Sequence, residues 1–181
     1  MFKHLFLTVM VFGMAQAVSI APTMAQSDVI TEDMVAQKYS QLEKVLNNRA
    51  DYMSAVKFLH THISDDAKIR VTVSNPVANN AAKSPAMEMS KEAYINTYLQ
   101  GTQFVEGYQM DIEMAGFEYD PQSQSAATLE IMTERGEVKG LNESKAFVSK
   151  TMCRTEHKLQ GDAVVAMASQ CHTDISFEEN V

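Results

Sequence analysis

The second half of the chain constrains the fold most, because it contains four long stretches in which apolar and polar residues alternate. The stretches cover residues 108–119, 126–137, 145–158 and 163–177. Alternation with a period of two is typical of β-strands that bury one face. Residues that favour turns separate the stretches, at Asp120-Pro121, at Arg135-Gly136 and Gly140 with Asn142, and at Gln160-Gly161-Asp162. The pattern predicts long antiparallel strands joined by short connections.

Helical spacing precedes these strands. Apolar residues recur at helical spacing over residues 27–49, where Asp28 or Thr31 can cap the helix, and again over residues 51–62. The remaining elements are a polar break at residues 63–66, a strand at 67–73, a segment at 87–89 that suits a short strand, and a third helix from Ser90 to about residue 105. We therefore expect an α+β domain in which three helices pack on one face of a curved, mainly antiparallel sheet.

Residues 1–25 have the pattern of a secretory signal peptide. Lys3 and His4 precede an apolar run, and small residues follow it up to Ala25. The apolar run has about ten residues, roughly half the length of a membrane-spanning helix, so we expect a cleaved signal and not an anchor. Cleavage after Ala17 and cleavage after Ala25 both fit, and we favour the second. The expected product is one domain over residues 26–181 that is periplasmic or secreted.

The charge of the chain argues against several partners. The full sequence has 15 basic and 23 acidic residues and a net charge of −8. Removing residues 1–25 takes away one basic residue, Lys3, and leaves −9. An acidic chain without a basic cluster is a poor candidate for binding nucleic acid or anionic lipid. No later apolar stretch approaches the length of a membrane span, so we expect a soluble protein.

The chain has two cysteines, Cys153 and Cys171. An even number of cysteines in an exported protein favours a disulfide. A turn near Gly161 places the two cysteines directly or diagonally opposite each other on the last two strands. We expect a cross-strand disulfide that fixes the register of this hairpin and contributes about 2–3 kcal/mol.

Two segments and the order of elements resemble the nuclear transport factor 2-like superfamily, which includes ketosteroid isomerases and polyketide cyclases. Phe58–Ile69 looks like the family's helix, Asp-Asp-Ala turn and first strand, and Ser90–Ile95 looks like the start of its third helix. The resemblance implies a cone-shaped fold and pairing of two copies through the open sheet face. In ketosteroid isomerases an aspartate before a proline shuttles the proton. The corresponding position here is Asn75, or Val71 without a gap, and neither can accept a proton near neutral pH.

Other candidate catalytic and metal-binding residues have simpler explanations. Asp65 and Asp66 stand at a helix–strand junction, where carboxylates usually form caps or turns. The spacing of Cys153, His157, Cys171 and His172 matches no standard zinc site, and a disulfide removes the thiolates. We therefore expect no metal, no cofactor and no titratable cluster enclosed between the sheet and the helices.

The abundance of methionine leaves two hypotheses for the interior. Nine of the 13 methionines lie beyond residue 25, and methionine recurs at adaptable binding surfaces. The first hypothesis is a core filled by ordinary methionines. The second is an apolar cleft lined by Tyr94, Tyr98, Met110, Met114, Phe117 and Phe147.

Three functional hypotheses follow. The leading one is a non-catalytic exported domain that binds an apolar small molecule or a protein partner through its cleft or sheet face. The alternative is a cofactor-independent isomerase, dehydratase or hydrolase with Asp66, Tyr94 and Tyr98 as polar participants. The third is a subunit of an envelope assembly. A carboxylate or histidine enclosed in the interior would favour the enzyme.

Overall fold

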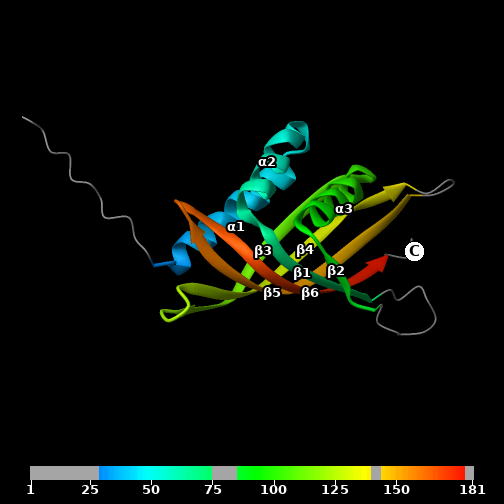
Figure 1. The fold of residues 1–181 in the computed structure, drawn as a ribbon. Coiled ribbons are helices and arrows are strands. Elements are labelled where there is room, and N and C mark those ends of the chain that lie inside the picture. The colour runs from blue at the N-terminus through cyan, green and yellow to red at the C-terminus, as the bar shows by residue number, and fades with distance from the viewer. Residues whose placement is uncertain (1–28, 75–84, 140–143, 178–181) are drawn as a thin grey trace, which may run out of the picture.

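One curved sheet of six strands carries three helices on its inner face (Figure 1). The structure is a computed structural model that describes residues 29–74, 85–139 and 144–177. Its elements are α1 (Glu32–Asn47), a 3₁₀ turn (Arg49–Asp51), α2 (Tyr52–His62), β1 (Ile63–Ser74), β2 (Met87–Met89), α3 (Lys91–Gln103), β3 (Val105–Asp120), β4 (Ser125–Lys139), β5 (Ser144–Gln160) and β6 (Ala163–Phe177). The predicted α+β architecture is confirmed.

The strands lie in the order β2-β1-β6-β5-β4-β3. The four C-terminal strands are antiparallel neighbours in chain order, whereas β1 runs parallel to β6, so the sheet is mixed. The predicted polar break at residues 63–66 is wrong, because β1 already begins at Ile63. The pairing of β1 with β6 shifts register between Ile63 and Lys68. This irregularity allows the strand to carry Asp65 and Asp66 on exposed positions.

Side-chain caps begin each of the three helices. The Thr31 hydroxyl accepts a hydrogen bond from the backbone N–H of Met34 at the start of α1. The Asp51 carboxylate caps α2, and the Ser90 hydroxyl caps α3. Each cap stabilises its helix by about 1 kcal/mol, because it satisfies a backbone donor that has no partner within the helix. The cap at Thr31 confirms one of the two predicted alternatives, and Asp28 lies outside the described residues.

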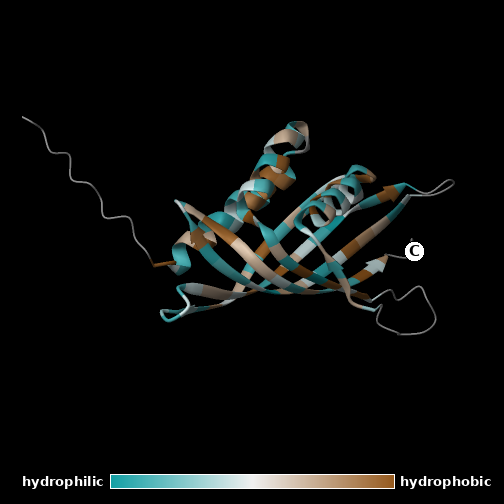
Figure 2. Ribbon diagram, in the orientation of Figure 1, coloured by the Kyte–Doolittle hydropathy of each residue, from teal (hydrophilic) through white to brown (hydrophobic). Residues whose placement is uncertain are grey.

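Alternation along the strands sorts side chains between an inner face and an outer face, and Figure 2 shows the corresponding alternation of hydropathy. Two apolar clusters lie between the inner face and the helices. The larger cluster joins α2 and α3 to β1 and β3, and the smaller one joins α1 to β4 and β6.

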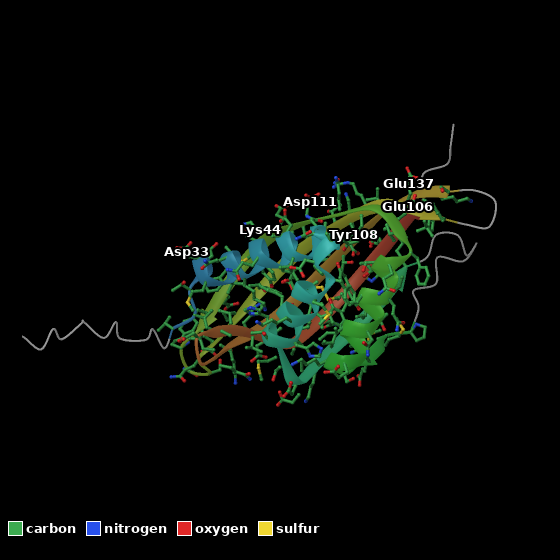
Figure 3. All side chains as sticks on the ribbon, turned by 90° about the horizontal axis from the view of Figure 1, so that it is seen from above. Asp33, Lys44, Glu106, Tyr108, Asp111 and Glu137 are labelled. Atoms are coloured by element: carbon green, nitrogen blue, oxygen red, sulfur yellow. A yellow bond between two sulfur atoms is a disulfide. The ribbon has the colours of Figure 1, made fainter. Side chains whose placement is uncertain are left out.

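Figure 3 shows α1 from above, lying along β3, with Asp33 and Lys44 on the helix and Asp111 on the strand. Tyr108 lies near the start of β3, at the end of the sheet that α3 covers.

The inner face of β5 is more polar than its sequence pattern predicted. Its buried residues are Ser149, Thr151, Cys153, Thr155 and His157. Cys153 pairs directly with Cys171 on β6, and the two form a disulfide with an S–S distance of 2.01 Å. The predicted bridge is therefore confirmed.

The predicted signal peptide, residues 1–25, lies outside the described residues, so this assignment stays a prediction. Among the described helices, none is both long enough and apolar enough to cross a membrane.

Candidate functional site

An open cavity of about 370 Å³ lies between α3 and the inner face of the sheet. Tyr94, Tyr98, Met110 and Phe147 line it, together with residues from β1, β2, β4 and β6. The other lining residues are Val71, Val73, Met87, Met89, Thr97, Gly101, Thr102, Val105, Tyr108, Met132, Glu134, Ser149, Thr151, Cys171, Thr173 and Ile175.

Two of the six residues expected in the cleft lie elsewhere. Met114 and Phe117 pack against the smaller apolar cluster, which includes Val35 and Tyr39 of α1. The reason is the length of β3, because its C-terminal half runs beneath α1 and away from α3. A register shift between Met114 and Gly116 also interrupts the alternation there.

A chain of hydroxyl groups leads to a carboxylate at the wall of the open cavity. The Tyr108 hydroxyl donates a hydrogen bond to Glu134 Oε1 over 2.7 Å. The hydroxyls of Tyr98 and Tyr108 are hydrogen-bonded to each other, and the Tyr98 hydroxyl also lies 3.7 Å from Met110 Sδ. Tyr98 is one of the residues predicted to line the cleft, whereas Tyr108 and Glu134 are not among them.

Burial and the charge of Glu134 keep the cavity's tyrosines protonated. Burial, together with the charges of Glu134 and Glu130, raises the pKa of Tyr94 to about 12. Burial and the charge of Glu134 raise the pKa of Tyr98 and of Tyr108 well above the usual range. At neutral pH these hydroxyls are therefore donors as well as acceptors.

A second, polar cluster lies enclosed beneath α1. His157 is 0% exposed, and its Nδ1 lies 3.3 Å from Lys38 Nζ. Its Nε2 lies 3.1 Å from the Tyr39 hydroxyl and 3.0 Å from the Thr128 hydroxyl. The expectation that no titratable cluster is enclosed is therefore wrong. Docking of α1 brings Lys38 and Tyr39 onto the polar inner faces of β4 and β5, which the alternation pattern could not reveal.

Glu130 completes this cluster and is 3% exposed. It accepts hydrogen bonds from the hydroxyls of Thr128, over 2.8 Å, and Thr155. The Tyr39 and Thr128 hydroxyls lie 3.0 Å apart. One consistent assignment of protons has Lys38 donating to His157 Nδ1, Nε2–H donating to Tyr39, Tyr39 donating to Thr128 and Thr128 donating to Glu130. The contacts thus connect a cation to a carboxylate through neutral groups.

Burial controls the charges within the enclosed cluster. It lowers the pKa of His157 to about 3 and the pKa of Lys38 to about 8, and the charge of Glu130 partly offsets the effect on Lys38. Burial also raises the pKa of Glu130, against the hydrogen bonds of Thr155 and Thr128. His157 is therefore a neutral imidazole at neutral pH.

The enclosed cluster borders a cavity of about 80 Å³. This small cavity and the open cavity share Tyr94 and Met132 as lining residues, and the disulfide contributes Cys153 to the first and Cys171 to the second. The interior is therefore divided into an open compartment beneath α3 and a narrow one beneath α1 and α2.

The remaining candidate carboxylates lie outside both cavities. Asp66 is exposed and accepts a hydrogen bond from Ser64, while Asp65 forms an ion pair with Lys91 over 2.7 Å. Of the three polar participants considered for catalysis, only Tyr94 and Tyr98 line a cavity. Within the described residues, no group of three His, Cys, Asp or Glu side chains could hold a metal ion.

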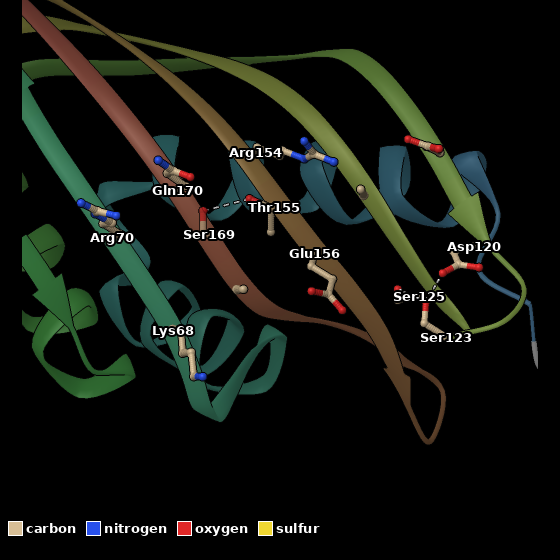
Figure 4. Close-up of a pocket in the computed structure, with 13 residues that line it drawn as sticks. Lys68, Arg70, Asp120, Ser123, Ser125, Arg154, Thr155, Glu156, Ser169 and Gln170 are labelled. Carbon is tan, nitrogen blue, oxygen red and sulfur yellow. Dashed lines mark hydrogen bonds between the residues drawn. The ribbon is translucent and has the colours of Figure 1, made fainter. Parts of the chain in front are cut away.

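The outer face of the sheet has a shallow hollow of about 600 Å³ (Figure 4). Arg70, Gln170 and Arg154 lie side by side across β1, β6 and β5. Toward β3 the outer face becomes apolar and then acidic. Leu129 and Met152 are 40% and 53% exposed there, and β3 contributes the exposed carboxylates of Asp111, Glu113 and Glu118.

No family model and no curated protein sequence matches this chain. Solved structures do match it. A hexachlorocyclohexane dehydrochlorinase, LinA type 2, superposes with a TM-score of 0.55 at 7% identity over 82% of this chain and 89% of its own. A conserved protein from Planctomyces limnophilus superposes with a TM-score of 0.55 at 10% identity over 81% and 97%. A ketosteroid isomerase-like protein from Erwinia carotovora atroseptica gives 0.50 at 13% identity over 80% and 98%. The chain therefore has the nuclear transport factor 2-like fold.

Proposed function

We propose that this protein binds an apolar small molecule in the open cavity and releases it unchanged. The observation that carries the proposal is a preformed cavity of about 370 Å³ whose exposed wall is mainly apolar. Ligand sites in proteins have volumes of about 300–1,000 Å³ and combine apolar walls with a small number of polar groups. The Tyr98, Tyr108 and Glu134 chain supplies such groups at one wall.

A second candidate is a cofactor-independent enzyme that transfers protons, and the enclosed cluster favours it. Buried titratable groups with shifted pKa values are common at catalytic sites. One structural neighbour is named as a dehydrochlorinase, although at 7% identity the similarity shows the fold alone.

Three features of the enclosed cluster nevertheless argue against catalysis there. A general base works best with a pKa near the working pH, whereas the pKa of His157 is about 3. Both of its ring nitrogens already contact groups of the protein, from Lys38, Tyr39 and Thr128. The adjoining cavity of about 80 Å³ is well below the roughly 300–1,000 Å³ of small-molecule sites in proteins.

Ligand binding can be tested with the uncharged fluorescent probe N-phenyl-1-naphthylamine. Ile175 lines the open cavity, so Ile175→Trp adds bulk to that side of the sheet. Ser176 is the next residue on β6 and is exposed, and because neighbouring strand residues point to opposite faces, Ser176→Trp places the same bulk outside the cavity. We expect Ile175→Trp to weaken probe binding at least about tenfold and Ser176→Trp to leave it unchanged.

Absence of probe binding by the unmodified protein, or equal binding by Ile175→Trp, would contradict the proposal. The enzyme candidate is tested on the ligand itself. Native mass spectrometry of protein purified from its source identifies a retained molecule, and chromatography after incubation shows whether that molecule is altered. Conversion that Lys38→Met abolishes would establish the second candidate instead.

We also propose that the protein acts in the periplasm or outside the cell. The signal-peptide pattern of residues 1–25 and the Cys153–Cys171 disulfide support this location. The intact mass of protein recovered from the cell envelope is expected to match a chain that begins at Gln26. A mass that includes residues 1–25 would contradict the proposal.

A further inference from the structure

Glu134 is a carboxylate at the wall of a mainly apolar cavity. It lies on β4 between Met110 of β3 and Ser149 of β5, and one of its oxygens accepts the Tyr108 hydrogen bond. Among the described residues that line the cavity, Glu134 is the one with an acidic or basic side chain. No ion pair joins it to a lysine, arginine or histidine of the described chain. A partly buried carboxylate is more stable when a cation compensates its charge.

The contrast with Glu130 shows what Glu134 lacks. The two carboxylates lie on the inner face of the same strand, four residues apart, with Met132 between them. Glu130 belongs to the enclosed cluster, where the charge of Lys38 acts on it. Glu134 faces the open cavity and is provided with hydroxyl groups but with no lysine. The described part of the fold therefore provides a cation near the enclosed carboxylate and none that pairs with the accessible one.

Aromatic side chains surround the same space. Tyr94, Tyr98, Tyr108 and Phe147 all line the cavity, and the rings of Tyr94 and Tyr98 stack with centroids 6.3 Å apart. The face of an aromatic ring attracts a cation, most strongly where water is excluded. Burial raises the pKa of all three tyrosines, so their hydroxyls add no negative charge, yet the charge of Glu134 reaches each of them.

We propose that the open cavity selects an organic cation with an apolar body, such as a hydrophobic amine or quaternary ammonium compound, whose charge lies beside Glu134 and the surrounding aromatic rings. The inference rests on the proposed binding function and specifies the chemical class of its ligand. The apolar body would contact the methionine and valine side chains of the wall, and the net charge of −8 attracts cations from solution.

The experiment compares three compounds that differ in charge, by displacement of N-phenyl-1-naphthylamine. They are benzyltrimethylammonium, its uncharged carbon isostere neopentylbenzene, and the phenylacetate anion. We expect the cation to bind about tenfold more tightly than the isostere and the anion to bind most weakly. Glu134→Gln should remove the preference for the cation while leaving the isostere's affinity unchanged. The matched control is Glu137→Gln, which changes an exposed carboxylate on the outer face of the same strand.

The outcomes separate this inference from the function on which it rests. If the fluorescent probe fails to bind, the binding function itself fails. If the probe binds but the isostere matches or exceeds the cation, or neither displaces the probe, the cavity binds apolar molecules without selecting cations and the inference is overturned. Equal cation affinity in Glu134→Gln and in the unmodified protein would also overturn it, since another group would then carry the selectivity.

Discussion

Replacing His157 by glutamine should change how the stability of the protein depends on pH. Glutamine can accept a hydrogen bond from Lys38 and donate one to Tyr39, but it does not titrate. Burial holds the pKa of His157 at about 3 in the folded protein, against 6.5 for an exposed histidine. The unfolded chain therefore binds a proton between these values and the folded protein does not. His157 thus lowers the stability as the pH falls below 6.5, with the full loss reached below about 3.

The magnitude follows from the two pKa values. A pH of 5 is about 1.5 units below the pKa of the unfolded histidine, so protonation of the unfolded chain lowers the free energy of unfolding by about 2 kcal/mol. At pH 7.5 the same effect is below about 0.1 kcal/mol. Glu130 opposes this trend, because its raised pKa stabilises the folded protein as the pH falls. The unmodified protein alone therefore does not isolate the histidine. The difference between the two proteins does, since Glu130 remains in both.

Urea unfolding at pH 7.5 and pH 5.0 measures the effect. The unmodified protein should lose about 2 kcal/mol more than His157→Gln between these two conditions. Tyr39→Phe is the matched control, because it removes a hydroxyl from the same cluster but keeps the histidine. It should lower the stability at both pH values and retain the pH dependence. A difference below about 0.5 kcal/mol between the unmodified protein and His157→Gln would refute a neutral, buried His157.

Three further predictions concern the framework. The Cys153–Cys171 bridge joins residues 18 apart, so its loss in the double alanine variant should cost about 3 kcal/mol in urea unfolding, and free thiols in the unreduced protein would contradict it. Gly136→Ala would place a Cβ atom 2.3 Å from a side-chain carbon of β3 and should cost about 1–3 kcal/mol, whereas Gly116→Ala, with its closest contact at 3.7 Å, should cost less; equal losses would contradict the packing. We propose that two copies pair through the outer face, with the basic side of one over the acidic side of the other. Sedimentation should then show a dimer that Met152→Glu dissociates, and a monomer at high concentration would disprove the pairing.

Part of the site could have been predicted from strand parity. On β4, Thr128, Glu130 and Glu134 share their parity with Ala126 and Met132, which face the helices. Polar residues on an apolar face are the signal of a buried polar site, and this signal was overlooked. His157 shares the strand parity of Cys153 on β5, although its spacing was considered only for a metal site. Met114 and Phe117 were misplaced for another reason, since parity gives the face of a strand and not the helix that covers each part of it.

The amino-acid sequence by itself determined the local structure: alternation gave the strands, capping residues gave the starts of the helices, and parity brought Cys153 opposite Cys171. These features depend on neighbours in the chain or across one hairpin, where spacing is nearly fixed. Only the tertiary structure decided that Lys38 meets His157, 119 residues away, and that no lysine among the described residues lines the cavity beside Glu134. The position of a helix on a sheet depends on how many side chains pack at once, so the contacts that set charge and burial in the two cavities emerge only when the layers are assembled.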